Sequence, residues 1–264
     1  MSVKIMEGKR GIIMGLANDR SLAYGIAQKL YEQGADIAFA YQAEALKSRV
    51  EPIAKSFGSD FLIECDVSKD GDIQKMFDTL KAKWGKIDFV VHALAFSDKN
   101  ELKGPYYNTS KANFLNALNI SCYSFTETCK CAMDIMNEGG SLVTLTYYGA
   151  EKVMPNYNVM GVAKAALECS VRYLANDMGP HGIRVNALSS GPVRTLAASG
   201  ISDFRAMLKW TEANAPLRRN TTLEDVGGAG LYLLSQLSSG VTGEIHYVDS
   251  GYNIIGMKSL DDER

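Results

Sequence analysis

The sequence has no excess of positive charge and no long apolar run. Its 28 Lys and Arg residues are balanced by 30 Asp and Glu residues, which gives a net charge of −2 at pH 7. A protein that binds nucleic acid through phosphate contacts needs clustered cations, so this balance argues against such a partner. No segment approaches the roughly 18 apolar residues of a membrane-spanning helix, and the amino terminus has no signal-peptide core. We therefore expect a cytoplasmic protein without a membrane partner.

Cysteine and histidine are also scarce, and neither is spaced for disulfides or metal binding. The 5 cysteines are odd in number and form no C-x-x-C pair, and the 3 histidines are scattered along the chain. A zinc site or a disulfide framework would need paired, closer spacing. We expect buried thiols in a reducing compartment and no metal site.

Short β-branched or apolar runs alternate with longer helical patterns along the whole chain. This alternation is typical of β-α-β units around a parallel sheet. We therefore predict an α/β fold, a single doubly wound, Rossmann-like domain over residues 1–264 with helices flanking a parallel sheet. The seven predicted strands cover residues 11–14, 36–40, 61–65, 87–91, 141–145, 183–187 and 244–248.

One segment, residues 195–222, departs from this rhythm. Its mixed pattern contains Gly200 and Pro216 and does not continue the alternation of strands and helices. We interpret it as a helical lid that covers a ligand. An ordinary amphipathic helix packed on the core is the alternative.

The first predicted strand is followed by a glycine-containing turn at residues 15–27. It matches neither G-x-G-x-x-G nor the T-G-x-x-x-G-x-G pattern of most short-chain dehydrogenases. Even so, Gly15 permits a sharp turn, Ser21 can cap the next helix and offer a hydroxyl to a pyrophosphate, and Gly25 lets that helix pack closely on the sheet. A purely structural turn explains these residues equally well.

The second and third predicted strands end at residues suited to binding an adenosine. Gln42 can donate to and accept from ribose hydroxyls but cannot neutralise a 2′-phosphate, which favours NAD(H). Lys47 and Arg49 keep NADPH open as the alternative. Asp66 and Val67 are placed to bracket the adenine, although Asp66 is also a common residue at a helix entry.

Two tyrosine–lysine pairs follow the fifth predicted strand. Tyr148 and Lys152 form a literal Y-x-x-x-K, the spacing of one helical turn. Pro155 suits a helix start rather than a helix interior, so residues 148–153 are predicted to be a loop. We interpret this first pair as a decoy.

The second pair, Tyr157 and Lys164, is seven residues apart in the helix that follows. Two turns place the two residues on one face, about 10.5 Å apart along the axis. This gap suits a lysine that holds a nicotinamide ribose and a tyrosine that reaches the substrate, with the ammonium favouring phenolate character. On spacing alone, an ordinary surface pair is equally compatible.

Several segments together resemble one known family. They are Tyr157-x6-Lys164, with Tyr147 where short-chain dehydrogenases usually carry serine, and also Gln42 and residues 15–27, 91–96 and 191–201. The chain resembles the divergent short-chain dehydrogenase branch that contains the bacterial NADH-dependent enoyl-[acyl-carrier-protein] reductases. The resemblance extends from Gly8 to about Gly251.

The resemblance implies a role for individual residues. Tyr157 would bind the thioester carbonyl, Lys164 the ribose hydroxyls, and Tyr147 would line the acyl pocket and assist proton delivery. The implied NADH contacts are Gly15, Ser21, Leu22, Gln42, Asp66, Val67, Leu94, Lys164, Val193, Arg194, Thr195, Leu196 and Ala197. The other implied substrate contacts are Ser97, where the family commonly has alanine, and Leu196, Ala197, Ile201, Phe204 and Met207.

The activity implied by this resemblance is NADH-dependent reduction of trans-2-enoyl thioesters. The partner would be an acidic acyl carrier protein, with Arg205 and Lys209 either docking it or simply solvated. The family also implies a homotetramer. Two alternatives stay open: a short-chain dehydrogenase that acts on carbonyls through Tyr148 and Lys152, and a non-catalytic dinucleotide-binding sensor.

Overall fold

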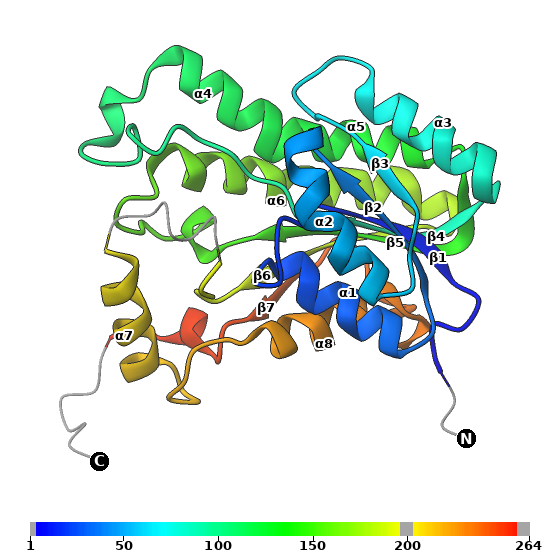
Figure 1. The fold of residues 1–264 in the computed structure, drawn as a ribbon. Helices are drawn as coiled ribbons and strands as arrows, with labels where there is room; N and C mark the ends of the chain where they lie inside the picture. Colours follow the sequence, from blue (N-terminus) through cyan, green and yellow to red (C-terminus); the bar gives the residue numbers. More distant parts are fainter. Residues whose placement is uncertain (1–3, 196–202, 258–264) are drawn as a thin grey trace.

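The computed structural model describes residues 4–195 and 203–257, which form a parallel sheet covered by helices (Figure 1). The strands are β1 (Arg10–Met14), β2 (Asp36–Tyr41), β3 (Leu62–Glu64), β4 (Ile87–His92), β5 (Met136–Thr146), β6 (Arg184–Ser190) and β7 (Ile245–Val248). The α-helices are α1 (Leu22–Glu32), α2 (Glu44–Ser56), α3 (Asp72–Trp84), α4 (Lys111–Leu118), α5 (Ser124–Ala132), α6 (Asn158–Met178), α7 (Phe204–Asn214) and α8 (Leu223–Leu234).

Shorter helical segments connect these elements. They are η1 (Tyr106–Asn108), the π-helical turn η2 (Asn119–Tyr123), η3 (Tyr148–Ala150), η4 (Gly179–His181), η6 (Gln236–Ser238) and η7 (Tyr252–Ile254). In the part of the chain that the structure describes, no helix combines the length and the apolar character needed to span a bilayer.

The strand order is β3-β2-β1-β4-β5-β6-β7, and every pairing is parallel. The chain winds outward from β1 to β3, returns to β4 beside β1, and then winds outward in the other direction. This confirms the predicted seven-stranded, doubly wound sheet. The reversal between β1 and β4 is the place where such sheets bind dinucleotides.

The strand ends differ from the prediction most clearly at β5. It begins at Met136 rather than residue 141, because its first residues pair with β4 through an irregularity: Ile87 pairs with Met136, and Phe89 with Ser141. Gly139, with φ +80°, lies in this irregular stretch. Glycine made the stretch look like a turn in the sequence.

Two apolar layers hold the helices on the two faces of the sheet. Buried residues of α3, α5 and α6 pack on one face, and those of α1, α2 and α8 pack on the other. Gly25 was predicted to let α1 pack closely on the sheet, but the element that it approaches is α8. A Cβ on Gly25 would lie 2.3 Å from the carbonyl oxygen of Leu223, and one on Gly227 would lie 2.3 Å from that of Gly25, so the close approach joins α1 to α8.

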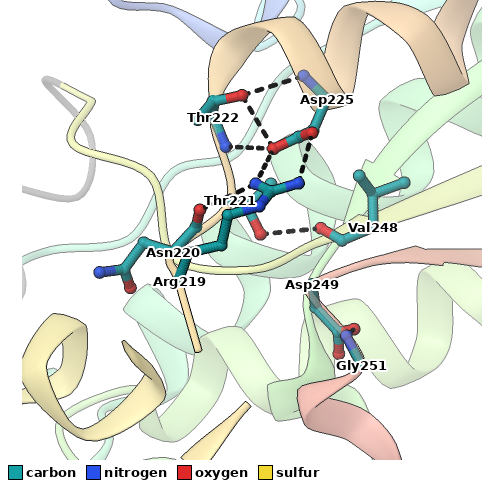
Figure 2. A network of polar contacts seen from close by, with 8 residues as sticks. All are labelled: Arg219, Asn220, Thr221, Thr222, Asp225, Val248, Asp249 and Gly251. Carbon is teal, nitrogen blue, oxygen red and sulfur yellow. Dashed lines mark hydrogen bonds and ion pairs between the residues drawn. The ribbon is translucent and has the colours of Figure 1, made fainter. Parts of the chain in front are cut away.

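A polar network fixes the chain between α7 and α8 (Figure 2). The Arg219 guanidinium donates to both carboxylate oxygens of Asp225, at 2.5 and 3.0 Å. Asp225 and Thr222 form a capping box at the start of α8, and the Thr221 hydroxyl donates to the carbonyl of Val248 on β7 at 3.1 Å. The carboxyl end of the predicted lid is therefore tied to both α8 and β7.

We expect Asp225→Asn to lower the free energy of unfolding by about 1 kcal/mol at pH 7. The hydrogen bond from Arg219 lowers the pKa of Asp225 to about 2 although burial opposes it. A depressed carboxyl pKa stabilises the fold above the ordinary value of about 3.9 and ceases to do so as pH falls through about 2. In urea unfolding at fixed protein concentration, the difference between wild type and variant should shrink towards pH 2. Exposed Asp70, changed to Asn, serves as control, and a pH-independent difference would contradict the assignment.

Candidate active site

The site begins where the loops after β1 and β4 meet. Gly15 has φ +95°, and a Cβ there would lie 2.1 Å from the carbonyl oxygen of Ala93. Only glycine allows this conformation and this approach of backbone to backbone. The contact lies at the carboxyl ends of the two strands where the sheet order reverses, as predicted for Gly15.

Ser21 precedes α1, but the prediction that its side chain caps the helix is wrong. Its hydroxyl oxygen accepts from the backbone N–H groups of Ala17 and Asn18, both at 3.1 Å, because the turn folds these groups towards it. The first turn of α1, which starts at Leu22, has no acidic residue and no side-chain cap. Its amino terminus can therefore receive an anion such as a pyrophosphate.

The same turn faces the start of the lid across a cleft of about 1250 Å³. Asn18, Asp19 and Arg20 line one side, and Arg194, Thr195 and residues 203–206 and 208 line the other. Val193 is half-buried beside them against the apolar layer of α1 and α8. The structure thus brings two predicted cofactor segments, 193–195 and the loop before α1, to the same cleft.

Helix α7 carries the described part of the lid. In Figure 1 it lies at the end of the molecule opposite the amino terminus. Phe204 lines the cleft, Met207 is half-buried on the same helix, and Arg205 and Lys209 are exposed. The other predicted wall residues, Leu196, Ala197 and Ile201, lie outside the described residues.

The adenosine end of the site contains the predicted residues Gln42 and Asp66, joined by a hydrogen bond that the sequence did not predict. Gln42 at the end of β2 hydrogen-bonds the carboxylate of Asp66 after β3. Burial would raise the pKa of Asp66, but hydrogen bonds from Ser68 and Gln42 outweigh it and hold the pKa below its usual value. Lys47 forms an exposed ion pair with Glu44 at 3.4 Å. Gln42 with Asp66 suits ribose hydroxyls better than a 2′-phosphate.

Val67 and Leu94 lie beside this end of the site. Both are half-buried and pack against the apolar layer of α3, α5 and α6. Their remaining exposed surface is compatible with a contact to a flat adenine or nicotinamide ring.

Tyr157 is buried, with 9% of its surface exposed, at the residue just before α6. The sequence placed it inside the helix. The helix begins only at Asn158, because Asn156 and Asn158 adopt left-handed backbone angles, with φ +56° and +36°. Asparagine tolerates such angles better than most residues. Gly149 makes room for the ring, since a Cβ there would lie 2.5 Å from Tyr157 Cδ1.

Lys164 is the buried cation of the site, with 4% of its surface exposed. Its Nζ donates to the carbonyl oxygen of Leu145 at 2.7 Å, which uses one of three N–H groups among the described residues. Burial lowers the pKa of Lys164 to about 8. An ammonium with two N–H groups to spare in a buried position is suited to ribose hydroxyls.

Tyr147 and Tyr157 face each other, with ring centroids 5.1 Å apart in an edge-to-face arrangement. Burial raises the pKa of Tyr157, and Tyr147 and Glu168 raise it further. Burial also raises the pKa of Tyr147. The expected phenolate character of Tyr157 is therefore wrong, because burial disfavours the charged form of the phenol. Both side chains are therefore neutral phenols, whose O–H groups are able to donate hydrogen bonds.

Ser97 lies in the loop after β4, and a buried asparagine holds it. The amide of Asn113 donates to the Ser97 hydroxyl at 3.1 Å, and its oxygen accepts from the backbone N–H of Asp98 at 3.0 Å. Ser121 in η2 accepts from the N–H of Phe96 at 2.9 Å. Sequence reasoning missed Asn113 and Ser121, because only the fold brings α4 and η2 against this loop.

Sequence reasoning also missed the structural role of His92, which lies at the end of β4. Its Nε2 lies 2.8 Å from the Ser124 hydroxyl, which donates its proton to the carbonyl of Ile120 at 2.6 Å. Its Nδ1 lies 3.0 Å from the Thr144 hydroxyl, which donates to the carbonyl oxygen of His92 at 3.3 Å. Burial lowers its pKa to about 3, so the imidazole is neutral and ties β4 to β5 and α5.

Tyr148 and Lys152, the literal Y-x-x-x-K pair, do not lie together on one turn of an α-helix. Tyr148 lies in η3, and its hydroxyl donates to the carbonyl of Asn253 at 3.1 Å. Lys152 is exposed in the bend that follows. The predicted loop is found at residues 151–153, whereas residues 148–150 form a short 3-10 turn. This geometry does not support the carbonyl-reducing alternative that relied on the pair.

The described residues fit a nicotinamide dinucleotide. The loop approach at Gly15, the uncapped start of α1, the Gln42–Asp66 pair and the spare donors of Lys164 meet the needs of its phosphates and two riboses. Each of these features lies at the carboxyl edge of the sheet.

Comparisons with known proteins agree with this site. The model of a family described as "Enoyl-(Acyl carrier protein) reductase" matches residues 15–253. The chain is 62% identical to enoyl-[acyl-carrier-protein] reductase [NADH] 2 of Rhizobium meliloti over 97% of this chain and 96% of that protein, and 49% identical to the Escherichia coli enzyme over 97% and 98%.

A solved structure is equally similar. The enoyl-(acyl-carrier-protein) reductase of Anaplasma phagocytophilum, determined in complex with NAD, superposes with a TM-score of 0.95 at 59% identity, covering 98% of this chain and 99% of that one. The match extends over the whole sheet and the site at its edge. The chain therefore belongs to the enoyl-(acyl carrier protein) reductase family.

Proposed function

We propose that this chain is an NADH-dependent enoyl-[acyl-carrier-protein] reductase of fatty acid biosynthesis. It reduces trans-2-enoyl thioesters to saturated acyl thioesters. The observation that carries the proposal is the pair of buried donors, Tyr157 and Lys164, at the carboxyl edge of a doubly wound sheet in a member of this family. The names of the curated relatives specify NADH, which agrees with Gln42 and Asp66 at the ribose end.

Tyr157 acts on the substrate, and Lys164 binds the cofactor. NADH, when bound, supplies hydride to Cβ of the conjugated thioester. Tyr157 is a neutral phenol and donates a hydrogen bond to the thioester oxygen, where negative charge develops. The charge on Lys164 and its two spare N–H groups hold the ribose hydroxyls. The buried surroundings strengthen both interactions by excluding water.

The remaining residues shape the acyl side. Tyr147, packed edge-to-face on Tyr157, lines the pocket and passes a proton towards Cα. Ser97, fixed by Asn113, contacts the substrate. Phe204 and Met207 of α7 contribute to the apolar wall of the lid.

A steady-state assay tests the proposed function directly. Purified protein is mixed with a short-chain trans-2-enoyl thioester and either NADH or NADPH, and oxidation is followed at 340 nm. We expect turnover with NADH, much slower turnover with NADPH, and none with simple ketones. Binding of NADH without turnover of any enoyl thioester would instead support the sensor alternative.

We also propose a homotetramer in the cytoplasm, with acyl carrier protein as the partner that presents the substrate. Exposed Arg205 and Lys209 on α7 lie beside the cleft and suit an acidic partner. Sedimentation of the purified protein tests the assembly.

Reversing both charges, Arg205→Glu with Lys209→Glu, should raise KM for carrier-bound substrate about tenfold and leave kcat unchanged. The reason is that exposed charges act mainly on encounter with a charged partner, each contributing up to about 1 kcal/mol. KM for a carrier-free thioester is the control, because no acidic partner is involved. An unchanged KM for the carrier-bound substrate would remove these residues from the docking surface.

A further inference from the structure

Glu168 is a buried carboxylate that the mechanism above does not use. It lies on α6, one turn beyond Lys164, and 6% of its surface is exposed. The hydroxyl of Thr146 donates to its Oε1 at 2.6 Å. Leu145, the neighbour of Thr146 at the end of β5, accepts from Lys164 at 2.7 Å. Two consecutive residues of one strand therefore hold the lysine and the carboxylate.

The two side chains share a helix face without touching. Residues four apart on a helix are neighbours on its surface, with a rise of about 6 Å between them. Among the described residues no ion pair within 4.0 Å joins Lys164 to Glu168. Both groups are buried, so solvent screens the attraction between them far less than it would at the surface.

The other titratable groups that face Lys164 carry no charge near neutral pH. His92 on β4 is neutral because burial lowers its pKa to about 3. Cys122 in η2 is a thiol rather than a thiolate because burial raises its pKa. Glu168 is thus the group among those facing Lys164 that can supply a negative charge.

Some of the groups around Glu168 raise the pKa of its carboxyl group, and others lower it. Burial raises its pKa, and Glu151, after η3, adds to this, whereas the Thr146 hydrogen bond, Arg172 and Lys164 oppose it. Two phenols, Tyr157 before α6 and Tyr247 on β7, also face it. The hydrogen bond from Thr146 favours the ionised carboxylate.

We propose that Glu168 is a positioning residue that keeps the buried ammonium of Lys164 charged across one turn of α6. In this role it maintains the donor that holds the ribose of the dinucleotide. The inference rests on the proposed function for the identity of that ligand, but the charge state of Lys164 does not depend on turnover.

The test is Glu168→Gln, which keeps the shape of the side chain and removes its charge. The protein is labelled with ¹³C at the lysine ε-carbons, and Lys164 is identified from the resonance that Lys164→Arg removes. In the ligand-free protein the pKa of Lys164 should fall by about 1 unit. NADH should then bind about fivefold more weakly at pH 8 and with unchanged affinity at pH 6.

Glu151→Gln is the matched control, because this exposed carboxylate faces Glu168 but is not among the groups that act on Lys164. It should leave the titration of Lys164 unchanged. A Lys164 titration that is the same in wild type and Glu168→Gln would overturn the proposal, as would equal shifts in both variants.

A second variant keeps the test decisive if Glu168→Gln does not fold. Thr146→Val removes the hydrogen bond that favours the ionised carboxylate and is expected to lower the pKa of Lys164 in the same direction by a smaller amount. No shift there would count against Glu168. If the Lys164 pKa falls in Glu168→Gln as expected but the wild-type protein does not reduce enoyl thioesters, the proposed function is refuted and the role of Glu168 is not.

Discussion

Tyr157→Phe is expected to lower kcat by 100- to 1000-fold while NADH still binds. The variant loses only a hydroxyl that donates to the developing charge on the thioester oxygen, and one such donor contributes about 3–4 kcal/mol to the transition state. Tyr157 is buried and neutral, which suits it to donate this hydrogen bond away from bulk water. Steady-state kinetics with NADH and an enoyl thioester, together with NADH titration by fluorescence, give the two quantities.

Two further variants separate this role from a general disturbance of the site. Tyr148→Phe removes a phenol of the same kind whose hydroxyl donates to the carbonyl of Asn253, and it should leave kcat unchanged. Lys164→Ala should weaken NADH binding by at least tenfold in addition to slowing turnover, because hydrogen bonds to a charged group are worth about 1.5–3 kcal/mol. Unchanged turnover in Tyr157→Phe would contradict the proposed mechanism.

The positions of the strands along the chain could be predicted because each alternation of an apolar run and a helical pattern leaves a local signal. The exact ends could not. β5 starts five residues early because its pairing with β4 contains an irregularity beside Gly139, and an irregular pair depends on both strands. The helix that carries Lys164 could be predicted, but not its first residue. The helix begins after Tyr157 because Asn156 and Asn158 adopt left-handed backbone angles.

The site could be predicted where spacing along one element decides geometry, and not where separate elements meet. Tyr157 and Lys164 are close in sequence, so their spacing suggested a pair, but their burial is a property of the assembled fold. Asp66 beside Gln42 depends on β2 and β3 lying side by side, which no local pattern encodes. The neutral state of Tyr157 depends on burial, which is a property of the assembled fold. Glu168 was overlooked because a carboxylate on a long helix usually faces solvent.

Gly25→Ala is expected to lower the free energy of unfolding by about 3 kcal/mol, at the upper end of the usual cost of overpacking. The added Cβ would lie 2.3 Å from the carbonyl oxygen of Leu223, a backbone atom that cannot rotate away. The capping box of Thr222 and Asp225 and the Arg219 ion pair fix this end of α8 (Figure 2), so α1 must move instead. Urea unfolding measures the loss. NADH should also bind more weakly, because the displaced helix presents its amino terminus to the phosphates.

Gly228→Ala is the matched control for this prediction. Gly228 lies in α8 three residues beyond Asp225, and an added Cβ there would meet nothing within 4 Å. Alanine is favoured over glycine in a helix interior by about 0.5–1 kcal/mol, so this variant should be slightly more stable than the wild type. Opposite signs for the same substitution at two glycines of the same helix pair would locate the effect in the contact between α1 and α8. Equal effects would show instead that helix propensity decides and that the close approach of the two helices can relax without cost.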